Sequence, residues 1–293
     1  MNKYNTTINL QTYHAQQLIK ATGKIDYTFT NDYMFHAVLQ SNETVLRGLL
    51  GALLRRKQNE ILQIEIKNPI VLGEALDDKT FIMDLLILLN NHTSIDLEMQ
   101  VNREDDWTDR SLSYLCRNYD KLFRGQAYEQ VHPAMHIGIL DFDLFPDELE
   151  FYASYMMLNI KNHKIFNDKF ILNVLSLNQI ELATDTDRRW QLDTWARLFK
   201  AKTWEEIHMI AKQNKAFASA AQTLYQYNED ERIRWQCRQR EDYDRHERIQ
   251  IKKIQDLTEQ VSQQKTALAE KDSALAEKDQ RIAELETILK EKQ

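Results

Sequence analysis

The chain has 293 residues, which is enough for one substantial globular domain with an appendage or for two small domains. Hydrophobic residues make up 43% and charged residues 28%, a balance that allows a packed core and argues against general disorder. Only 6 glycines and 3 prolines are present, which argues against an all-β sandwich, where turn signals recur every ~8–12 residues.

The formal net charge of −7 argues against a large non-specific phosphate-binding surface, although it is compatible with a metal site made of clustered carboxylates. Cys116 and Cys237 lie far apart and without metal-ligand spacing, so we expect free thiols in a reducing compartment. No apolar run reaches the ~18 residues of a membrane span, and the polar start of the chain lacks the apolar region of a signal peptide. These features predict a cytoplasmic protein without membrane association.

Two helices are predicted after a leader at residues 1–25 that has no clear period. A helix is expected to start near Thr30, where Thr30, Asn31 or Asp32 can act as the cap. A second helix follows Ser41. Its apolar stripe recurs at helical spacing and consists of Val45, Leu46, Leu49, Leu50, Leu53 and Leu54.

Three strand-like segments follow, at residues 61–72, 81–89 and 94–101. The second, FIMDLLILL, is almost continuously apolar, and Asp84 is its only polar residue. The third, SIDLEMQV, alternates with period two, so that Asp96, Glu98 and Gln100 share one face. The short polar connection NNHTS predicts an antiparallel hairpin between the second and third strands.

A helix over about 108–123 and a buried strand over 135–142 complete an α/β unit. The hairpin supplies antiparallel pairing and the helical crossover a parallel pair, so a mixed sheet flanked by helices is expected. From about 146 to 248 the pattern is predominantly helical, except for 170–177, which is either another strand or a buried helix. We therefore expect a leader at 1–25, an α/β core at 26–150, a helical extension at 151–248 and a separate tail at 249–293.

The tail carries an apolar residue at every seventh position from Ile254 to Leu289, and the segment ALAEKD occurs twice in register. This pattern predicts a coiled coil of about five heptads, and therefore a homo-oligomer. The mixed residues at the core positions leave dimer and trimer open. The alternative is a lone amphipathic helix packed on the globular part of the chain.

Three polar side chains, Asp84, Glu98 and Gln100, form the candidate catalytic site. A carboxylate inside an apolar strand is costly to bury unless it is paired, hydrogen-bonded or bound to a metal. If the two strands pair through the hairpin, Asp84 and Glu98 approach each other across the ladder and provide the oxygen ligands that Mg²⁺ prefers. Alternatively, Asp84 caps a strand end or pairs with a buried cation, and Glu98 and Gln100 lie on a solvated face.

The order of elements, the Asp inside an apolar strand and the segment IDLEMQV resemble the PD-(D/E)XK nuclease superfamily, and in particular its transposase-associated Rpn branch of recombination-promoting nucleases. TNDYMFHAVL, RSLSYLCRNYDKLFRGQAYEQV and IGILDFDLF also resemble that branch. The resemblance is good over residues 24–150 and looser beyond. It implies a restriction-endonuclease-like core and a magnesium-dependent nuclease acting on DNA.

By position, the resemblance makes Asp84 and Glu98 the metal ligands, with the main-chain carbonyl of Met99 as a third. Gln100 stands where the superfamily usually has Lys, and a Gln there is usual in the Rpn-like branch. A neutral Gln can only position the water or a phosphate oxygen, whereas a Lys also stabilises the charge that develops on phosphate.

Four further residues are candidates for supporting roles. Asp32 matches the acidic residue of the family's N-terminal motif and is expected to support the metal site, with Glu43 as a rival for that role. Arg110 and Lys121 lie on the helix after the motif strand, where they either bind substrate phosphate or simply keep the surface soluble.

Two functions follow from these observations. The first is a cytoplasmic Mg²⁺-dependent endonuclease that hydrolyses DNA phosphodiesters, with a role linked to recombination, mobile elements or defence by analogy with the family. The second is a catalytically inactive scaffold or DNA-binding module that keeps the nuclease fold and assembles through its coiled coil.

Overall fold

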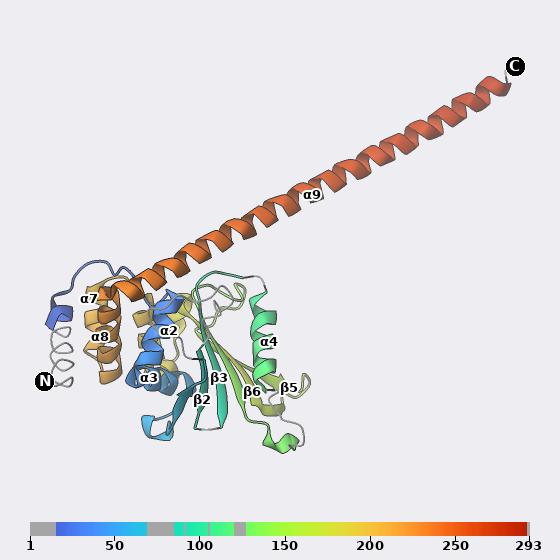
Figure 1. The fold of residues 1–293 in the computed structure, drawn as a ribbon. Helices are drawn as coiled ribbons and strands as arrows, with labels where there is room; N and C mark the ends of the chain where they lie inside the picture. The colour runs from blue at the N-terminus through green and yellow to red at the C-terminus, as the bar shows by residue number, and fades with distance from the viewer. Residues whose placement is uncertain (1–15, 69–84, 91, 105, 120–126, 292–293) are drawn as a thin grey trace. The chain divides into compact units, whose positions relative to one another are not determined.

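A computed structural model describes residues 16–68, 85–90, 92–104, 106–119 and 127–291. The chain divides into two compact units, Met1–Arg240 and Glu241–Gln293. The first unit contains all the described strands, as Figure 1 shows for the ribbon.

One six-stranded mixed sheet forms the centre of the first unit, with the strand order β1-β2-β3-β4-β6-β5. Its middle strands are the apolar segments of the sequence, as expected for strands covered on both faces. The strands are β1 (Ile64–Ile66), β2 (Leu85–Leu89), β3 (Thr93–Gln100), β4 (Ala134–Leu140), β5 (Tyr152–Leu158) and β6 (Ile165–Ser176).

The register confirms the predicted hairpin and crossover. β2 and β3 pair antiparallel, from Leu89 opposite Thr93 to Leu85 opposite Leu97. β3 and β4 pair parallel, so that Glu98 lies opposite Gly138. The mixed sheet with its flanking helices confirms the predicted α/β class and is consistent with a restriction-endonuclease-like core.

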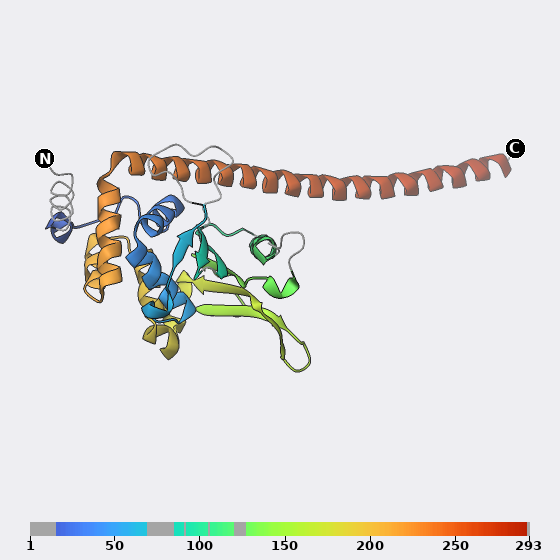
Figure 2. The ribbon, with the colours of Figure 1, turned by 60° about the horizontal axis from the view of Figure 1, so that its bottom comes forward.

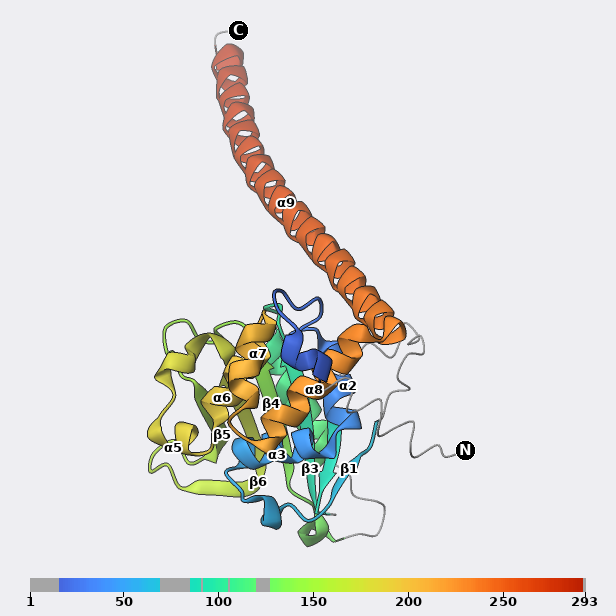
Figure 3. The same ribbon diagram turned by 90° about the vertical axis from the view of Figure 1, so that its left-hand side faces the viewer.

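Helices cover both faces of this sheet. α4 packs on β4, β6 and β3, while α2, α3 and the helices that follow the sheet pack on the other face (Figures 1 and 3). Asn31 caps α2 by accepting a hydrogen bond from the Met34 N–H, which selects one of the three predicted caps. The helices are α2 (Asp32–Ser41), α3 (Glu43–Leu54), α4 (Trp107–Tyr119), α5 (Asp185–Arg189), α6 (Leu192–Lys200), α7 (Trp204–Ala211), α8 (Lys215–Glu229) and α9 (Glu231–Glu291), with short 3₁₀ turns at Gln58–Glu60, Tyr128–Gln130 and Leu177–Leu182.

The alternation in β3 places its side chains in two different environments. Ile95, Leu97 and Met99 belong to the large core shared with α2, α3, α6 and α8. Asp96 and Glu98 point to the face covered by α4, where both are buried. The polar face of the motif strand is therefore enclosed by a helix, not solvated as the alternative from the sequence required.

The stretch from 146 onwards is less helical than predicted. β5 and β6 form an antiparallel hairpin, and residues 170–176 of β6 also pair parallel with β4, so the undecided segment 170–177 is a strand up to Ser176. The first residues of β6 pair with β5 alone, and Figure 2 shows this hairpin extending beyond the other strands. Helices dominate only from Asp185 onwards.

α9 is a single helix of 61 residues. Its first residues belong to the first unit, where Ile233 and Cys237 are buried. No helix in the described part of the chain is long and apolar enough to cross a membrane.

Candidate functional site

Glu98 lies at the centre of the candidate site and is 3% exposed. One carboxylate oxygen, Oε1, accepts a hydrogen bond from the indole N–H of Trp107. The same oxygen lies 3.7 Å from Nε2 of His136, and the other oxygen, Oε2, lies 3.7 Å from the guanidinium of Arg110. These three groups come from α4 and β4, so the helix and the neighbouring strand together fix the carboxylate.

Trp107 reaches Glu98 because β4 has a glycine at the point of contact. A Cβ on Gly138 would collide with atom Cζ2 of the indole ring and lie 2.9 Å from Cη2. Glycine inside a strand often marks such a close approach. The first turn of α4 therefore sits tightly on the sheet, directly over the pair Glu98–Gly138.

His136 lies between two buried carboxylates, with Nδ1 3.2 Å from Asp96 and Nε2 facing Glu98. Burial alone would lower the pKa of His136, but hydrogen bonding to Asp96 and the two negative charges raise it to about 9. Burial alone would raise the pKa of Glu98, yet His136, the charge of Arg110 and the Trp107 N–H lower it overall. Glu98 is thus held ionised, and His136 is held protonated at neutral pH.

Gln100, Glu104 and Arg110 form a closed hydrogen-bonded set beside Glu98. The Gln100 amide nitrogen donates to Glu104 Oε1 at 2.9 Å and to the carbonyl of Asn102 at 3.0 Å. The Gln100 amide oxygen accepts from Arg110 Nη2 at 3.1 Å. Arg110 Nη1 forms an ion pair with the second oxygen of Glu104.

The structure brings three of the predicted residues together: Glu98, Gln100 and Arg110. Asp84 and Lys121 lie outside the described residues. Met99 follows Glu98 in β3, and its side chain is buried in the large core.

The two predicted supporting acids have partners elsewhere. Asp32 forms an ion pair with Arg240 Nε at 2.7 Å, and Glu43 pairs with Arg47 one turn further along α3. The described contacts of Glu98 come instead from α4 and β4.

Four residues around Glu98 were given no role in the site from the sequence: Asp96, Glu104, Trp107 and His136. Asp96 was recognisable, because period two places it on the same face as Glu98. The glycine inside the strand that carries His136 was a weak signal for close packing. The contacts of Trp107 and Glu104 depend on where the loop and helix after β3 return, which the local pattern does not determine.

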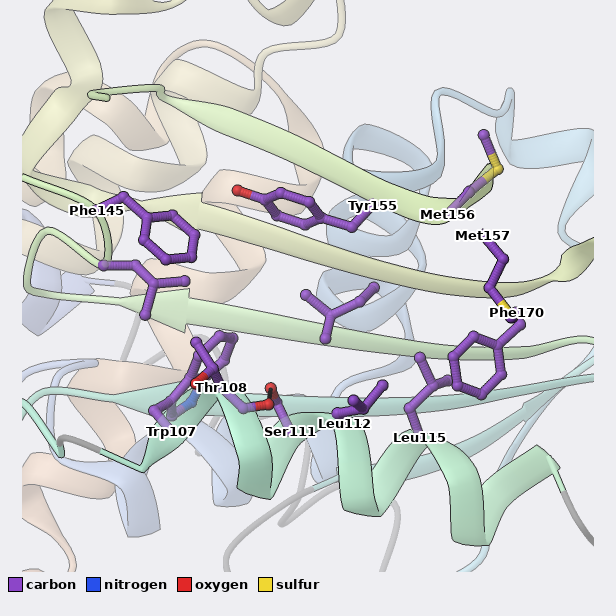
Figure 4. Close-up of a pocket in the computed structure, with 12 residues that line it drawn as sticks. Trp107, Thr108, Ser111, Leu112, Leu115, Phe145, Tyr155, Met156, Met157 and Phe170 are labelled. Atoms are coloured by element: carbon purple, nitrogen blue, oxygen red, sulfur yellow. Dashed lines mark hydrogen bonds between the residues drawn. The ribbon is translucent and has the colours of Figure 1, made fainter. Parts of the chain in front are cut away.

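An apolar pocket of about 260 Å³ lies beside the site (Figure 4). Trp107 belongs to both, because its N–H binds Glu98 and its side chain lines the pocket together with Leu112, Phe145, Met156 and Phe170. Among the residues that the structure describes, no carboxylate, histidine or cation lines this pocket. The acid–base and electrostatic groups are therefore grouped around Glu98, on the sheet under α4.

The oxygen donors around Glu98 are of the kind that suits magnesium. Carboxylate and carbonyl oxygens are the ligands that Mg²⁺ prefers. Within the described ranges, no group of three or more His, Cys, Asp or Glu side chains is arranged to hold a metal ion.

The mixed sheet and the acidic motif strand covered by α4 define a nuclease-like α/β protein. The family model described as PD-(D/E)XK nuclease family transposase matches residues 29–254, and the chain belongs to this family. Searches of curated proteins and of solved structures gave no significant match. The match covers most of the first unit, including β5 and β6, and so confirms the family resemblance found in the sequence.

Proposed function

We propose that the protein is a metal-dependent endonuclease that hydrolyses DNA phosphodiesters. The proposal rests on one observation: Glu98, the second acidic residue of the family motif, is a buried carboxylate kept ionised by cations and an indole N–H. An ionised carboxylate in an enclosed position is what a metal ligand requires. Membership of a family of nuclease-type transposases supports a role in recombination or mobile elements.

The strand register supports Asp84 as the second ligand. Leu85, the first described residue of β2, lies opposite Leu97, so the described register ends one position before Glu98. Residues directly opposite each other in a sheet point to the same face. We infer that Asp84 and Glu98, with the Met99 carbonyl, hold Mg²⁺.

Each described residue around Glu98 then has a definite task. A bound divalent cation supplies a water of lowered pKa and offsets negative charge on the phosphate. Trp107 fixes one oxygen of Glu98, which leaves the other to face the reacting groups. His136, which is bound by Asp96, lies beside the carboxylate on the neighbouring strand, and both residues exclude water from that side because they are buried.

The decisive test is cleavage of supercoiled plasmid by the purified chain with Mg²⁺ and with EDTA. We expect nicking or linearisation that requires Mg²⁺, and a loss of at least about 10³-fold in Asp84→Ala and in Glu98→Gln, because each change removes a metal ligand. Glu65→Gln is the matched control: Glu65 is an exposed carboxylate on β1 of the same sheet and is paired with Lys67.

If Glu98→Gln cleaves as fast as the unmodified chain, Glu98 is not a metal ligand and the proposed site is wrong. If the folded chain cleaves nothing with any of Mg²⁺, Mn²⁺ and Co²⁺, the scaffold function replaces the nuclease.

We also propose that α9 joins copies of the chain through a coiled coil. The apolar heptad positions of α9 with described side chains are between 46% and 64% exposed: Ile254, Leu257, Val261, Leu268, Leu275, Ile282 and Leu285. A seven-residue apolar repeat is the pattern by which helices pair. Two linked subunits would bring two active sites to the two strands of a duplex.

The free thiols Cys116 and Cys237 support a reducing compartment, in agreement with a cytoplasmic location.

A further inference from the structure

Gln100 stands at the position where the motif usually has a lysine, and its side-chain amide is hydrogen-bonded to other protein groups. An amide NH₂ has two protons, and in Gln100 one is donated to Asn102 and the other to Glu104. The Gln100 oxygen accepts from Arg110. In this arrangement Gln100 has no proton left to donate to a water or a phosphate, so it does not replace the lysine by itself.

Arg110 provides a positive charge at the same place. Its Nη2 atom touches Gln100 and lies 3.7 Å from Glu98 Oε2. Trp107 and Arg110 are three residues apart, so they share one face of α4 and approach different oxygens of the same carboxylate. Oε1 is bound by the indole, whereas Oε2 is the oxygen beside the cation.

Balancing the charge of Glu98 does not by itself account for the position of Arg110. His136 already faces Glu98 from the neighbouring strand and is completely buried, so it can balance charge but cannot meet a substrate. The Arg110 side chain is 26% exposed and can be reached from solvent. A guanidinium also presents several donors in a fixed fork that matches phosphate oxygens.

We propose that Arg110 is the catalytic cation of this protein and carries out the charge-stabilising task of the absent motif lysine. Gln100 and Glu104 are positioning residues that hold the guanidinium beside Glu98. An arginine stays protonated at all accessible pH values, so Arg110 does not act as a base and stabilises only negative charge on the phosphate. This inference rests on the proposed nuclease function.

The test compares Arg110→Gln with Arg117→Gln, a control on the same helix whose guanidinium lies over the ring of Tyr114. Under single-turnover conditions with Mg²⁺, we expect Arg110→Gln to cleave about 10²-fold more slowly and Arg117→Gln to cleave normally. Binding of Mn²⁺, followed by loss of its free-ion EPR signal, should become tighter in Arg110→Gln, because a positive charge beside Glu98 has been removed. A purely structural role would weaken Mn²⁺ binding as well.

The double variant Gln100→Lys/Arg110→Gln is the sharpest comparison, because it returns the positive charge to the motif position. We expect the double variant to cleave at least about tenfold faster than Arg110→Gln. If Arg110→Gln does not fold, as judged by thermal unfolding, Arg110→Lys takes its place, with a smaller loss expected because the charge is kept and the fork is lost.

The inference is overturned if Arg110→Gln cleaves at the unmodified rate, or if the double variant is no faster than Arg110→Gln. If the unmodified chain cleaves and Glu98→Gln does not, such a result refutes the role of Arg110 and leaves the proposed nuclease function intact. An unmodified chain that fails to cleave instead refutes the proposed function itself.

Discussion

Glu98 illustrates how a buried carboxylate is kept charged by groups from several elements. Removing a carboxylate from water is costly, and the cost is offset only when opposite charges and hydrogen bonds surround it. Here β4 contributes His136 and α4 contributes Trp107 and Arg110. Any change that shifts α4 away from the sheet should therefore affect the charge state and orientation of this one side chain.

Gly138→Ala is such a change. The added methyl group would collide with the ring of Trp107, so the first turn of α4 must move. We expect unfolding to become easier by about 1–3 kcal/mol, as is typical of overpacking, and Mg²⁺-dependent cleavage to fall about 10²-fold through misplacement of Glu98. Denaturant unfolding and single-turnover cleavage measure the two effects.

Gly48→Ala is the matched control, because its Cβ would lie 2.7 Å from the Cβ of Ala216 in the contact between α3 and α8. It should cost similar stability and leave the cleavage rate of the folded protein unchanged. The loss of unfolding free energy caused by Gly138→Ala should become smaller when Trp107 is replaced by Leu. An equal loss with Trp107 and with Leu at this position would contradict the proposed clash.

At the scale of single residues, the sequence predicted which side chains share a face better than which side chains touch. Period two placed Glu98 and Gln100 together, and the structure confirms that placement. The contacts of Glu98 with His136 and Trp107 depend on packing between elements far apart in the chain, which local spacing does not specify. The role assigned to Asp84 stays a prediction, since the residue lies outside the described ranges.

At the scale of elements, the sequence predicted those strands that have one polar and one apolar face, or two apolar faces that are both buried. β2, β3 and β4 have such patterns and were found, together with the helix between β3 and β4. β5 and the start of β6 expose large apolar side chains, among them Met157, Ile165 and Phe166. Their sequences alternate poorly for that reason, and the hairpin was predicted as part of a helical region.

Helix α7 allows a test of local energetics away from the site. Thr203 and Glu206 form a capping box, and Glu206 accepts hydrogen bonds from the backbone N–H groups of Lys202 and Thr203. These hydrogen bonds lower the pKa of Glu206 below its ordinary value of 4.5, and the bond from Lys202 has the largest effect. The charge of Glu206 therefore stabilises the fold above pH 4.5, and this contribution is lost as the pH falls through the lowered pKa.

Glu206→Gln should reduce the free energy of unfolding at pH 7 by less than about 1 kcal/mol, because the side chain is largely exposed. The difference from the unmodified chain should shrink below pH 4.5. Thr203→Ala removes the other half of the box and should cost about 1 kcal/mol at both pH values. Urea unfolding at pH 7 and pH 4 checks both variants, and a difference for Glu206→Gln that grows in acid would contradict the argument.

At the scale of the whole molecule, the heptad positions of α9 are expected to set the number of subunits. Val261→Asp/Leu268→Asp places charges in the proposed coiled-coil seam and should give a monomer in sedimentation velocity. Thr266→Asp/Ser273→Asp adds the same charge at positions five residues further along each heptad, outside the seam, and should leave the assembly intact. An unmodified chain that sediments as a monomer would exclude the coiled coil.

Subunit number should also appear in the products. If two active sites act on the two strands, the seam variant should nick plasmid while the unmodified chain linearises it. Equal linearisation by both would show that pairing through α9 is not needed for cutting both strands.

The tie between the start and the end of the first unit has a consequence for synthesis. Both backbone groups of Tyr27 bind the side chain of Asn228: the Tyr27 N–H donates to Oδ1 at 2.9 Å and the Tyr27 carbonyl accepts from Nδ2 at 3.0 Å. The two residues are 201 positions apart. At typical rates of translation, Tyr27 leaves the ribosome about 10–40 s before its partner exists. During that interval the aromatic segment around Tyr27 has no native place to pack, which makes the nascent chain a candidate for chaperone binding until α8 has been made.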